Sequence, residues 1–197
     1  MKKLFFIAAM MVATLSANAQ NEVGQWSIKP MVGANLATMT KVDDSKMRVG
    51  VTAGAEFAVG AAERFELSFG ALYSMQGVKG KDYYSGVKVD ETLKLDYINI
   101  PILANYYLAP GFAIKAGIQP GFNVTKKIKA EAQGVSAEES LDEGVKGFAL
   151  SVPVGLSYEI SGFVIDARYN WGLTKVFEGS DSKHSYFTIT LGYKIPF

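Results

Sequence analysis

The fold is decided by the C-terminal stretch Ser185-Tyr-Phe-Thr-Ile-Thr-Leu-Gly-Tyr-Lys-Ile-Pro-Phe197. Successive side chains of a β-strand point to opposite faces, so alternating residues report the two faces separately. One parity of this stretch is apolar throughout: Phe187, Ile189, Leu191, Tyr193, Ile195 and Phe197. The other parity is small or polar, and it includes Lys194. The sequence therefore predicts a strand with one apolar and one polar face.

Seven further stretches show the same alternation, and none of comparable length has a helical period. The eight predicted strands are Trp26–Leu36, Val49–Val59, Phe65–Gln76, Leu93–Leu108, Phe112–Val124, Gly147–Glu159, Phe163–Leu173 and Ser185–Phe197. Within the fourth strand the parity changes before Ile98, which predicts a bulge or the barrel rim near Tyr97.

The connections between these strands alternate in length. Long, hydrophilic connections are predicted at Thr38–Arg48, Gly77–Glu91, Lys126–Gly144 and Lys175–His184, and short ones at Gly60–Glu63, Ala109–Gly111 and Glu159–Gly162. In an up-and-down sheet, all long connections then lie at one rim, and the short turns and both termini at the other. Transmembrane barrels have this asymmetry and an even number of strands. We predict an all-β, eight-stranded antiparallel up-and-down transmembrane β-barrel of the outer-membrane type.

The alternative is a soluble eight-stranded cup with its apolar face inward. Such a barrel needs a densely charged exterior, whereas the polar parity here is mostly Gly, Ala, Ser, Thr and Asn. Aromatic residues also gather near both strand ends, as in the girdles of membrane barrels. One belt comprises Trp26, Phe57, Phe65, Tyr106, Phe112, Tyr158, Phe163 and Phe197, and the other Tyr73, Phe122, Phe148, Trp171 and Phe187. We therefore expect the apolar face to point outward.

An outward apolar face places eight charged residues of the polar parity in the lumen. They are Lys29, Lys115, Arg168 and Lys194, with Glu56, Glu66, Glu159 and Asp166. Four charges of each sign balance, and buried charges need partners. An eight-stranded barrel also has room only for side chains. We predict a lumen charge network that closes the interior, in place of an ion-selective pore.

The first residues have the features of an export signal. Lys2 and Lys3 precede an apolar run from Leu4 to Leu15, and Ala17-Asn-Ala19 provides small residues before a cleavage site. We predict a cleaved signal peptide over residues 1–19 and a single barrel domain over residues 20–197, located in the bacterial outer membrane. The alternative, a retained membrane anchor, would need a longer apolar run.

The composition excludes several classes of function. The net charge is +1 and becomes −1 without Lys2 and Lys3, so no basic excess remains to bind nucleic acid. The chain contains no cysteine, which rules out disulfides and thiolate metal sites.

The stretch Tyr97-Ile-Asn-Ile-Pro-Ile-Leu-Ala-Asn-Tyr-Tyr107 and the ending Gly192-Tyr-Lys-Ile-Pro-Phe197 resemble the PorT-like outer-membrane barrel family of Bacteroidetes. The resemblance covers the mature chain and implies an eight-stranded outer-membrane barrel. A relative in that family is tied to protein secretion, but no residue here is specific to that role. The C-terminal strand, with Tyr193 and Phe197, also resembles the signal that barrel insertion machinery reads.

Residues that could support chemistry are few. His184, the only histidine, lies beside Ser182, Ser185 and Asp181, but a hydrolase needs such groups to converge in space. Acidic pairs at Asp43-Asp44, Glu138-Glu139 and Asp142-Glu143 offer oxygen ligands for Ca²⁺ without an ordered spacing. We expect no catalytic residue, metal site or cofactor.

Tyr83 and Tyr84, in the second long connection, are the best candidates for recognition, because exposed loop aromatics can anchor partners. We predict a non-enzymatic outer-membrane protein, structural or presenting its surface loops to an extracellular or envelope partner. The alternatives are an outer-leaflet lipid-modifying barrel enzyme and an accessory component of a secretion system. Expected partners are outer-membrane lipid and the barrel insertion machinery, with no nucleic acid.

Overall fold

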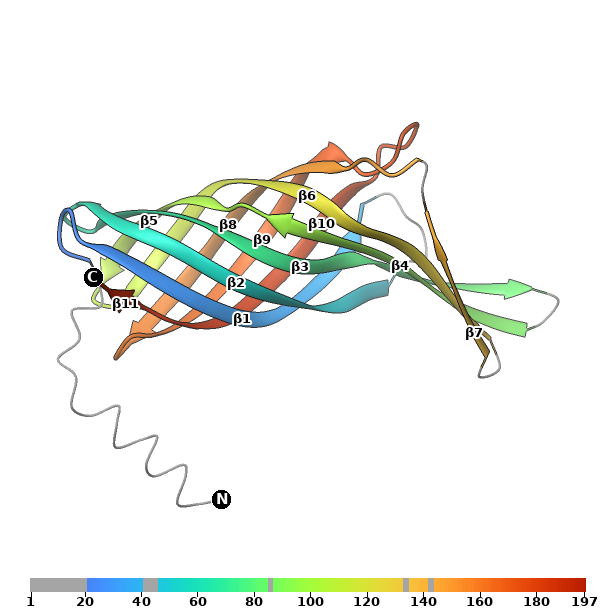
Figure 1. The fold of residues 1–197 in the computed structure, drawn as a ribbon, viewed down its shortest axis with the longest axis horizontal. Coiled ribbons are helices and arrows are strands. Elements are labelled where there is room, and N and C mark those ends of the chain that lie inside the picture. Colours follow the sequence, from blue (N-terminus) through green and yellow to red (C-terminus); the bar gives the residue numbers. More distant parts are fainter. Residues whose placement is uncertain (1–20, 41–45, 85–86, 133–134, 142–143) are drawn as a thin grey trace, which may run out of the picture.

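The computed structural model describes residues 21–40, 46–84, 87–132, 135–141 and 144–197 (Figure 1). The predicted signal peptide lies outside these ranges. Among the described residues, no helix is long and apolar enough to span a membrane.

The chain forms strands almost throughout. They are β1 (Trp26–Met39), β2 (Lys46–Ala62), β3 (Phe65–Tyr84), β4 (Val87–Asn99), β5 (Ile102–Ala109), β6 (Phe112–Ala132), β7 (Val135–Ser140), β8 (Phe148–Ile160), β9 (Phe163–Lys175), β10 (Lys183–Tyr193) and β11 (Ile195–Pro196).

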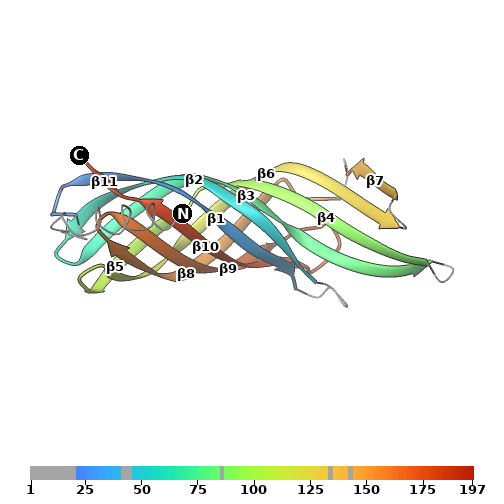
Figure 2. The ribbon, with the colours of Figure 1, turned by 90° about the horizontal axis from the view of Figure 1, so that it is seen from below.

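These strands close into an antiparallel ring with eight positions (Figures 1 and 2). β4 and β5 together fill one position between β3 and β6, and β10 and β11 together fill another beside β1. The ring closes where the C-terminal strand pairs with the first one, as in the pair Ala34–Ile189. The predicted eight-stranded up-and-down barrel is confirmed.

Two predicted strands are interrupted by residues that keep only single backbone hydrogen bonds to their neighbours. The fourth predicted strand breaks at Ile100-Pro101, because proline has no backbone N–H to donate. The last predicted strand breaks at Lys194, whose N–H donates to the Gly162 carbonyl instead. The irregularity predicted near Tyr97 is also present, as a register shift against β6 between Asp96 and Tyr97.

The three short turns lie at the same rim as the C-terminus (Figure 1). Between β8 and β9 only Ser161 and Gly162 turn the chain, with φ of 52° and 81°. Two consecutive positive φ values match the two-residue hairpin turn whose twist suits antiparallel strands.

The apolar parity faces outward, as predicted. Val32, Val154 and Ile165 are more than half exposed, while inward neighbours such as Asn35 and Asp166 are buried. Of the aromatic belts, only Phe65 and Phe112 are half-buried and the rest are exposed. Tyr73, Ile98, Phe122 and Phe148 lie opposite one another on neighbouring strands and form one cross-strand row.

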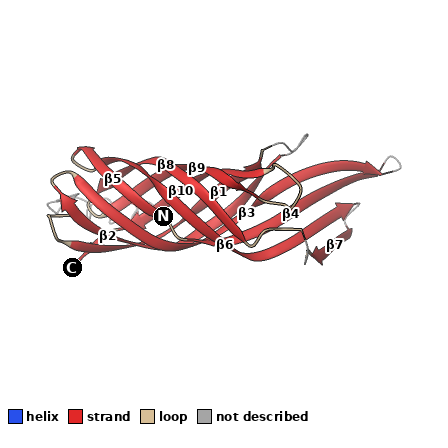
Figure 3. Ribbon diagram, turned by 90° about the horizontal axis from the view of Figure 1, so that it is seen from above, coloured by secondary structure: helices blue, strands red, loops and turns tan. Residues whose placement is uncertain are grey.

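The prediction of four long loops was wrong for the second and third. β3 and β4 pair out to Tyr84 and Val87, and β6 and β7 pair from Lys127–Ser140 out to Ala132–Val135. β4 also pairs with β6 as far as Asp90–Glu131. The outer parts of β3, β4 and β6, with β7, therefore form a four-stranded extension beyond the barrel (Figures 1 and 3). We call it the projecting sheet: residues 78–84, 87–95, 126–132 and 135–140.

The error has a physical cause. A strand outside the membrane needs no apolar face toward lipid, so its sequence is as hydrophilic as that of a loop. Backbone ladders and cross-strand charge pairs hold it instead, for example Lys127 of β6 with Glu138 of β7 at 2.8 Å.

Candidate functional site

The eight predicted lumen charges all point inward and are buried. They come from β1, β2, β3, β6, β8, β9 and the segment after β10, and they occupy the half of the lumen nearest the short turns. The ion pairs divide them into two groups.

Arg168 is the centre of the first group. Its Nη2 donates to Glu56 Oε2 at 3.0 Å and to Asp166 Oδ2 at 2.8 Å, and its Nε donates to Asp166 Oδ1 at 2.6 Å. Its Nη1 donates to the other Glu56 oxygen. Lys29 lies 2.8 Å from Glu56, and Lys115 lies 2.6 Å from Asp166. A planar guanidinium suits this double fork in a buried site.

Glycines on neighbouring strands make room for these long side chains. Gly155 lies opposite Arg168, and Gly70 lies opposite Glu56. A Cβ at Gly155 would lie 2.3 Å from the Ala167 carbonyl oxygen and 2.9 Å from Arg168 Cγ. One at Gly70 would lie 2.3 Å from the Ala55 carbonyl oxygen and 2.8 Å from Glu56 Cγ. The inward glycines are therefore part of how the sequence builds the charge network.

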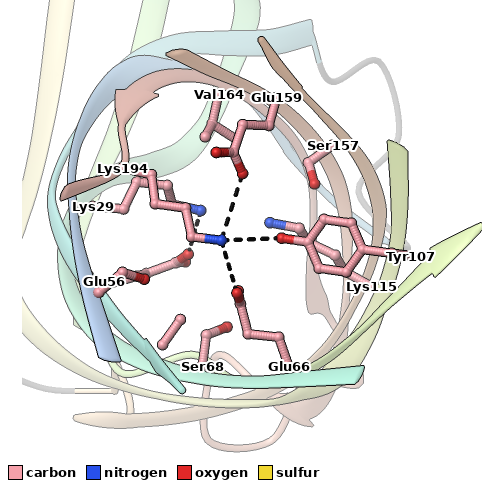
Figure 4. A pocket seen from close by; sticks show the side chains of 12 residues that line it. Lys29, Glu56, Glu66, Ser68, Tyr107, Lys115, Ser157, Glu159, Val164 and Lys194 are labelled. Carbon is pink, nitrogen blue, oxygen red and sulfur yellow. Dashed lines mark hydrogen bonds and ion pairs between the residues drawn. The ribbon is translucent and has the colours of Figure 1, made fainter. Parts of the chain in front are cut away.

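Lys194 is the centre of the second group (Figure 4). Its ammonium lies 2.8 Å from Glu66 and 3.5 Å from Glu159, and it donates to the Tyr107 hydroxyl at 3.3 Å. The first group has one cation in excess and this group has one carboxylate in excess, so the whole set is neutral. The hollow between the groups measures ≈ 20 Å³, room for about one water molecule.

Amides and hydroxyls fill the next layer toward the projecting sheet. Asn35 donates to Ser74 at 2.8 Å and accepts from Thr188 at 2.8 Å. The Tyr186 hydroxyl accepts from Gln119 at 2.5 Å and from Asn99 at 3.2 Å. A second hollow, beside Tyr186, measures ≈ 10 Å³.

Apolar side chains occupy the mouth beneath the projecting sheet. Leu95 and Tyr97 of β4 are almost completely buried, and residues from the connections after β7 and β9 pack against them. This mouth cluster consists of Met39, Val78, Leu95, Tyr97, Val145 and Val176, with Leu93, Leu141, Ala149 and Phe177 at its edge.

His184 lies within the lumen at this level. Its Nε2 is 2.9 Å from the Tyr97 hydroxyl, and the two rings meet edge to face. Asp181 is instead 2.7 Å from Lys175, and the Ser185 hydroxyl is 2.8 Å from that of Tyr169. Within the described chain, neither Ser182 nor Ser185 hydrogen-bonds His184, so a Ser-His-acid arrangement is not assembled.

The acidic pairs are only partly described. Asp43, Asp44, Asp142 and Glu143 lie outside the described residues. Glu138, on β7, accepts from Lys127 at 2.8 Å and also from Lys94. These hydrogen bonds, first that of Lys127, lower the pKa of the Glu138 carboxyl from 4.5 to about 2. The described part of the chain contains no group of three or more metal-ligating side chains.

The remaining predicted residues lie at opposite ends. Tyr83 and Tyr84 end β3 at the tip of the projecting sheet, and their side chains lie outside what the structure describes. Tyr193 packs edge to face on Phe163, and the Phe197 N–H donates to the Trp26 carbonyl at the short-turn rim.

Sequence reasoning missed a buried ion pair near the mouth. Arg48 Nη1 lies 3.1 Å from Asp96 Oδ1, and the Tyr73 hydroxyl donates to Asp96 Oδ2 at 2.9 Å. The sequence places Arg48 at the end of the first predicted long connection, Thr38–Arg48. The only signal was Asp96, an acid directly beside the predicted irregularity at Tyr97.

The fold has counterparts of known structure. Ail, the attachment invasion locus protein of Yersinia pestis, crystallised with the heparin analogue sucrose octasulfate, matches with a TM-score of 0.50 and 16% identity over 88% of this chain and 100% of that one. Neisserial surface protein A matches with a TM-score of 0.49 and 13% identity over 87% and 97%. At this identity the likeness to Ail shows the fold alone. No curated protein matches the chain.

The model of the family described as outer membrane protein beta-barrel domain matches residues 18–178, most of the chain. Together with the closed antiparallel ring and its outward apolar face, this match shows that the chain belongs to the outer membrane protein beta-barrel domain family and resides in the bacterial outer membrane.

Proposed function

We propose that the protein is a non-enzymatic envelope protein that presents the projecting sheet to an extracellular or envelope partner. Its lumen is closed and conducts neither ions nor solutes. The observation that carries the proposal is the contrast between an interior filled by buried ion pairs and a sheet extending beyond the barrel.

Closure of the lumen is supported at three levels. Charged groups, amides and apolar side chains occupy successive layers of the lumen. The hollow at the charged layer and the one at the amide layer are no larger than ≈ 20 Å³. A hydrated ion needs a continuous polar path. The apolar mouth cluster interrupts such a path, and the neutral charge network fills the lumen below it.

Presentation to a partner is supported by the edge of the projecting sheet. β7 pairs with β6 on one side only among the described residues, and Ser136 to Ser140 are exposed. An open strand edge offers unpaired backbone groups to an incoming extended segment. Tyr83 and Tyr84, at the tip of the neighbouring hairpin, add candidate anchors.

Cross-linking on intact cells tests presentation. A photoreactive residue at Ser136 or Ala137 should give a discrete protein adduct, whereas one at the lipid-facing Leu191 should give none. The register allows a matched shortened variant, with Asn-Gly joining Lys79 to Thr92 and Lys127 to Ser140. This variant should keep heat-modifiable migration in SDS gels and leave the partner uncaptured when the photoreactive residue replaces Ser140. Adducts of equal yield from Leu191 would contradict the proposal.

The non-enzymatic assignment has its own test. Because His184 is hydrogen-bonded to Tyr97 inside the lumen, His184→Ala should leave the mass spectrum of lipid A unchanged. A mass shift in lipid A between wild-type and His184→Ala cells would indicate an outer-leaflet enzyme. We also propose, on the resemblance of Tyr97–Tyr107 and Gly192–Phe197, that the chain is PorT-like.

A further inference from the structure

A row of lysines crosses the outward face of the projecting sheet and the adjoining end of β2. Lys46 of β2 lies opposite Lys79 of β3, Lys79 lies opposite Thr92 of β4, and Thr92 lies opposite Lys129 of β6. Directly paired residues share a face. Lys79 follows the parity of the lipid-facing Tyr73, so the row points away from the barrel axis.

The pair of Lys46 and Lys79 has no carboxylate partner within the part of the chain that the structure describes. Like charges directly opposite each other destabilise a sheet. Lys129 is paired with Glu131 at 2.9 Å, but among the described residues no carboxylate forms an ion pair with Lys46 or Lys79. Two other lysine pairs lie directly opposite each other, and each has a carboxylate. Glu138 accepts from both Lys94 and Lys127, and Asp181 lies 2.7 Å from Lys175 of the pair Lys175–Lys183.

The row that begins with Lys46 and Lys79 lines one hollow of ≈ 460 Å³, which is within the size range of small-molecule sites. Lys46, Lys79, Thr92 and Lys129 line its side nearer the barrel. The carboxylates of Asp90, Glu91 and Glu131 lie toward the tip, with Asp90 and Glu131 one outward row farther along. Two residues of strand separate these rows by about 7 Å. The hollow thus offers cations and a hydroxyl to a phosphate, and carboxylates to hydroxyl donors.

The distance of the hollow from the hydrocarbon region of the membrane indicates which kind of lipid headgroup can reach it. Thr92 and Lys79 each lie six residues beyond the cross-strand row of Tyr73, Ile98, Phe122 and Phe148. This is about 15 Å along the membrane normal for a strand tilted by about 40°. Phospholipid headgroups extend only about 5–8 Å beyond the hydrocarbon. A sugar headgroup of an outer-leaflet glycolipid reaches farther.

We propose that this hollow binds a phosphorylated sugar in the headgroup of lipopolysaccharide. The phosphate lies between Lys46 and Lys79, and sugar hydroxyls donate to Asp90 and Glu131. Binding at this site does not require a protein partner, so its test is independent of the test of the proposed function.

The test measures binding of lipopolysaccharide to the detergent-purified full chain by titration calorimetry. The probes are intact lipopolysaccharide, dephosphorylated lipopolysaccharide, and free glucose 6-phosphate. The variant is Lys46→Gln with Lys79→Gln, and the matched control is Lys175→Gln with Lys183→Gln. Heat-modifiable migration shows that each variant is folded, and Lys79→Gln alone serves if the double variant is not.

We expect wild type and control to bind intact lipopolysaccharide equally, and the Lys46/Lys79 variant to bind it at least about tenfold more weakly, since each lysine at a membrane surface contributes several-fold. Wild type should show the same loss with dephosphorylated lipopolysaccharide. The proposal would be overturned if the Lys46/Lys79 variant bound intact lipopolysaccharide as tightly as wild type does. It would also be overturned if wild type bound dephosphorylated and intact lipopolysaccharide equally. Glucose 6-phosphate bound as tightly as lipopolysaccharide would overturn the assignment to a lipid headgroup.

Discussion

The lumen and the projecting sheet use the same kinds of ion pair in opposite surroundings. Arg168 and Asp166 lie 2.6 Å apart with side chains 3% and 1% exposed, whereas Lys129 and Glu131 lie 2.9 Å apart with side chains 34% and 53% exposed. The distances are alike, so the difference between the two regions is hydration. In the lumen an unpaired charge has no water to replace its partner, while on the sheet water replaces it readily.

The largest expected effect follows from breaking the lumen network at its centre. Arg168→Met leaves two buried carboxylates with only lysine partners, so the free energy of unfolding should fall by about 3–5 kcal/mol. Urea unfolding in lipid vesicles measures it. The matched exposed change, Lys129→Met, should cost no more than about 1 kcal/mol. Similar losses in the two variants would remove the distinction drawn between the regions.

A smaller effect is expected at the apolar mouth, where the lumen meets the projecting sheet. Leu95 is completely buried in the mouth cluster, so Leu95→Ala leaves a cavity and should lower the free energy of unfolding by about 2–3 kcal/mol. The same urea titration measures the change. An unaltered unfolding midpoint would mean that the cluster does not pack as a core.

The smallest effect concerns Glu138 on the projecting sheet. Its pKa is lowered from 4.5 to about 2 by hydrogen bonds from Lys127 and Lys94. A lowered folded-state pKa means that the interaction is complete above pH 4.5 and is lost as the pH falls through about 2. Carboxyl-carbon NMR of the labelled residue should show a titration midpoint near 2. Lys127→Gln should move the midpoint upward, and a wild-type midpoint near 4.5 would refute the interaction.

Much of the barrel was predictable, because lipid on one side and a narrow lumen on the other impose strict alternation. Ile189 and Arg168 could each be assigned to a face from parity alone. The projecting sheet was not predictable, because water on both sides removes that constraint. Lys127, Lys129 and Glu131 therefore gave no signal that separates a strand from a loop.

The sequence predicts which charged residues face the lumen, but it does not predict which of them pair. Parity places Lys194 and Glu66 on the inner face, but their pairing depends on the stagger of the closed ring, which sequence alone does not fix. Tyr107 illustrates the limit. It shares the parity of Asn105, which indicates the inner face, but only the folded ring brings its hydroxyl to 3.3 Å from Lys194.

Conductance of the purified protein in planar lipid bilayers shows whether the lumen is closed. We expect no steady channel openings from the wild-type protein, and none from the shortened variant that lacks residues 80–91 and 128–139, because the charge network and the mouth cluster remain in both. Stable, ion-selective openings from the wild-type protein would contradict a closed lumen.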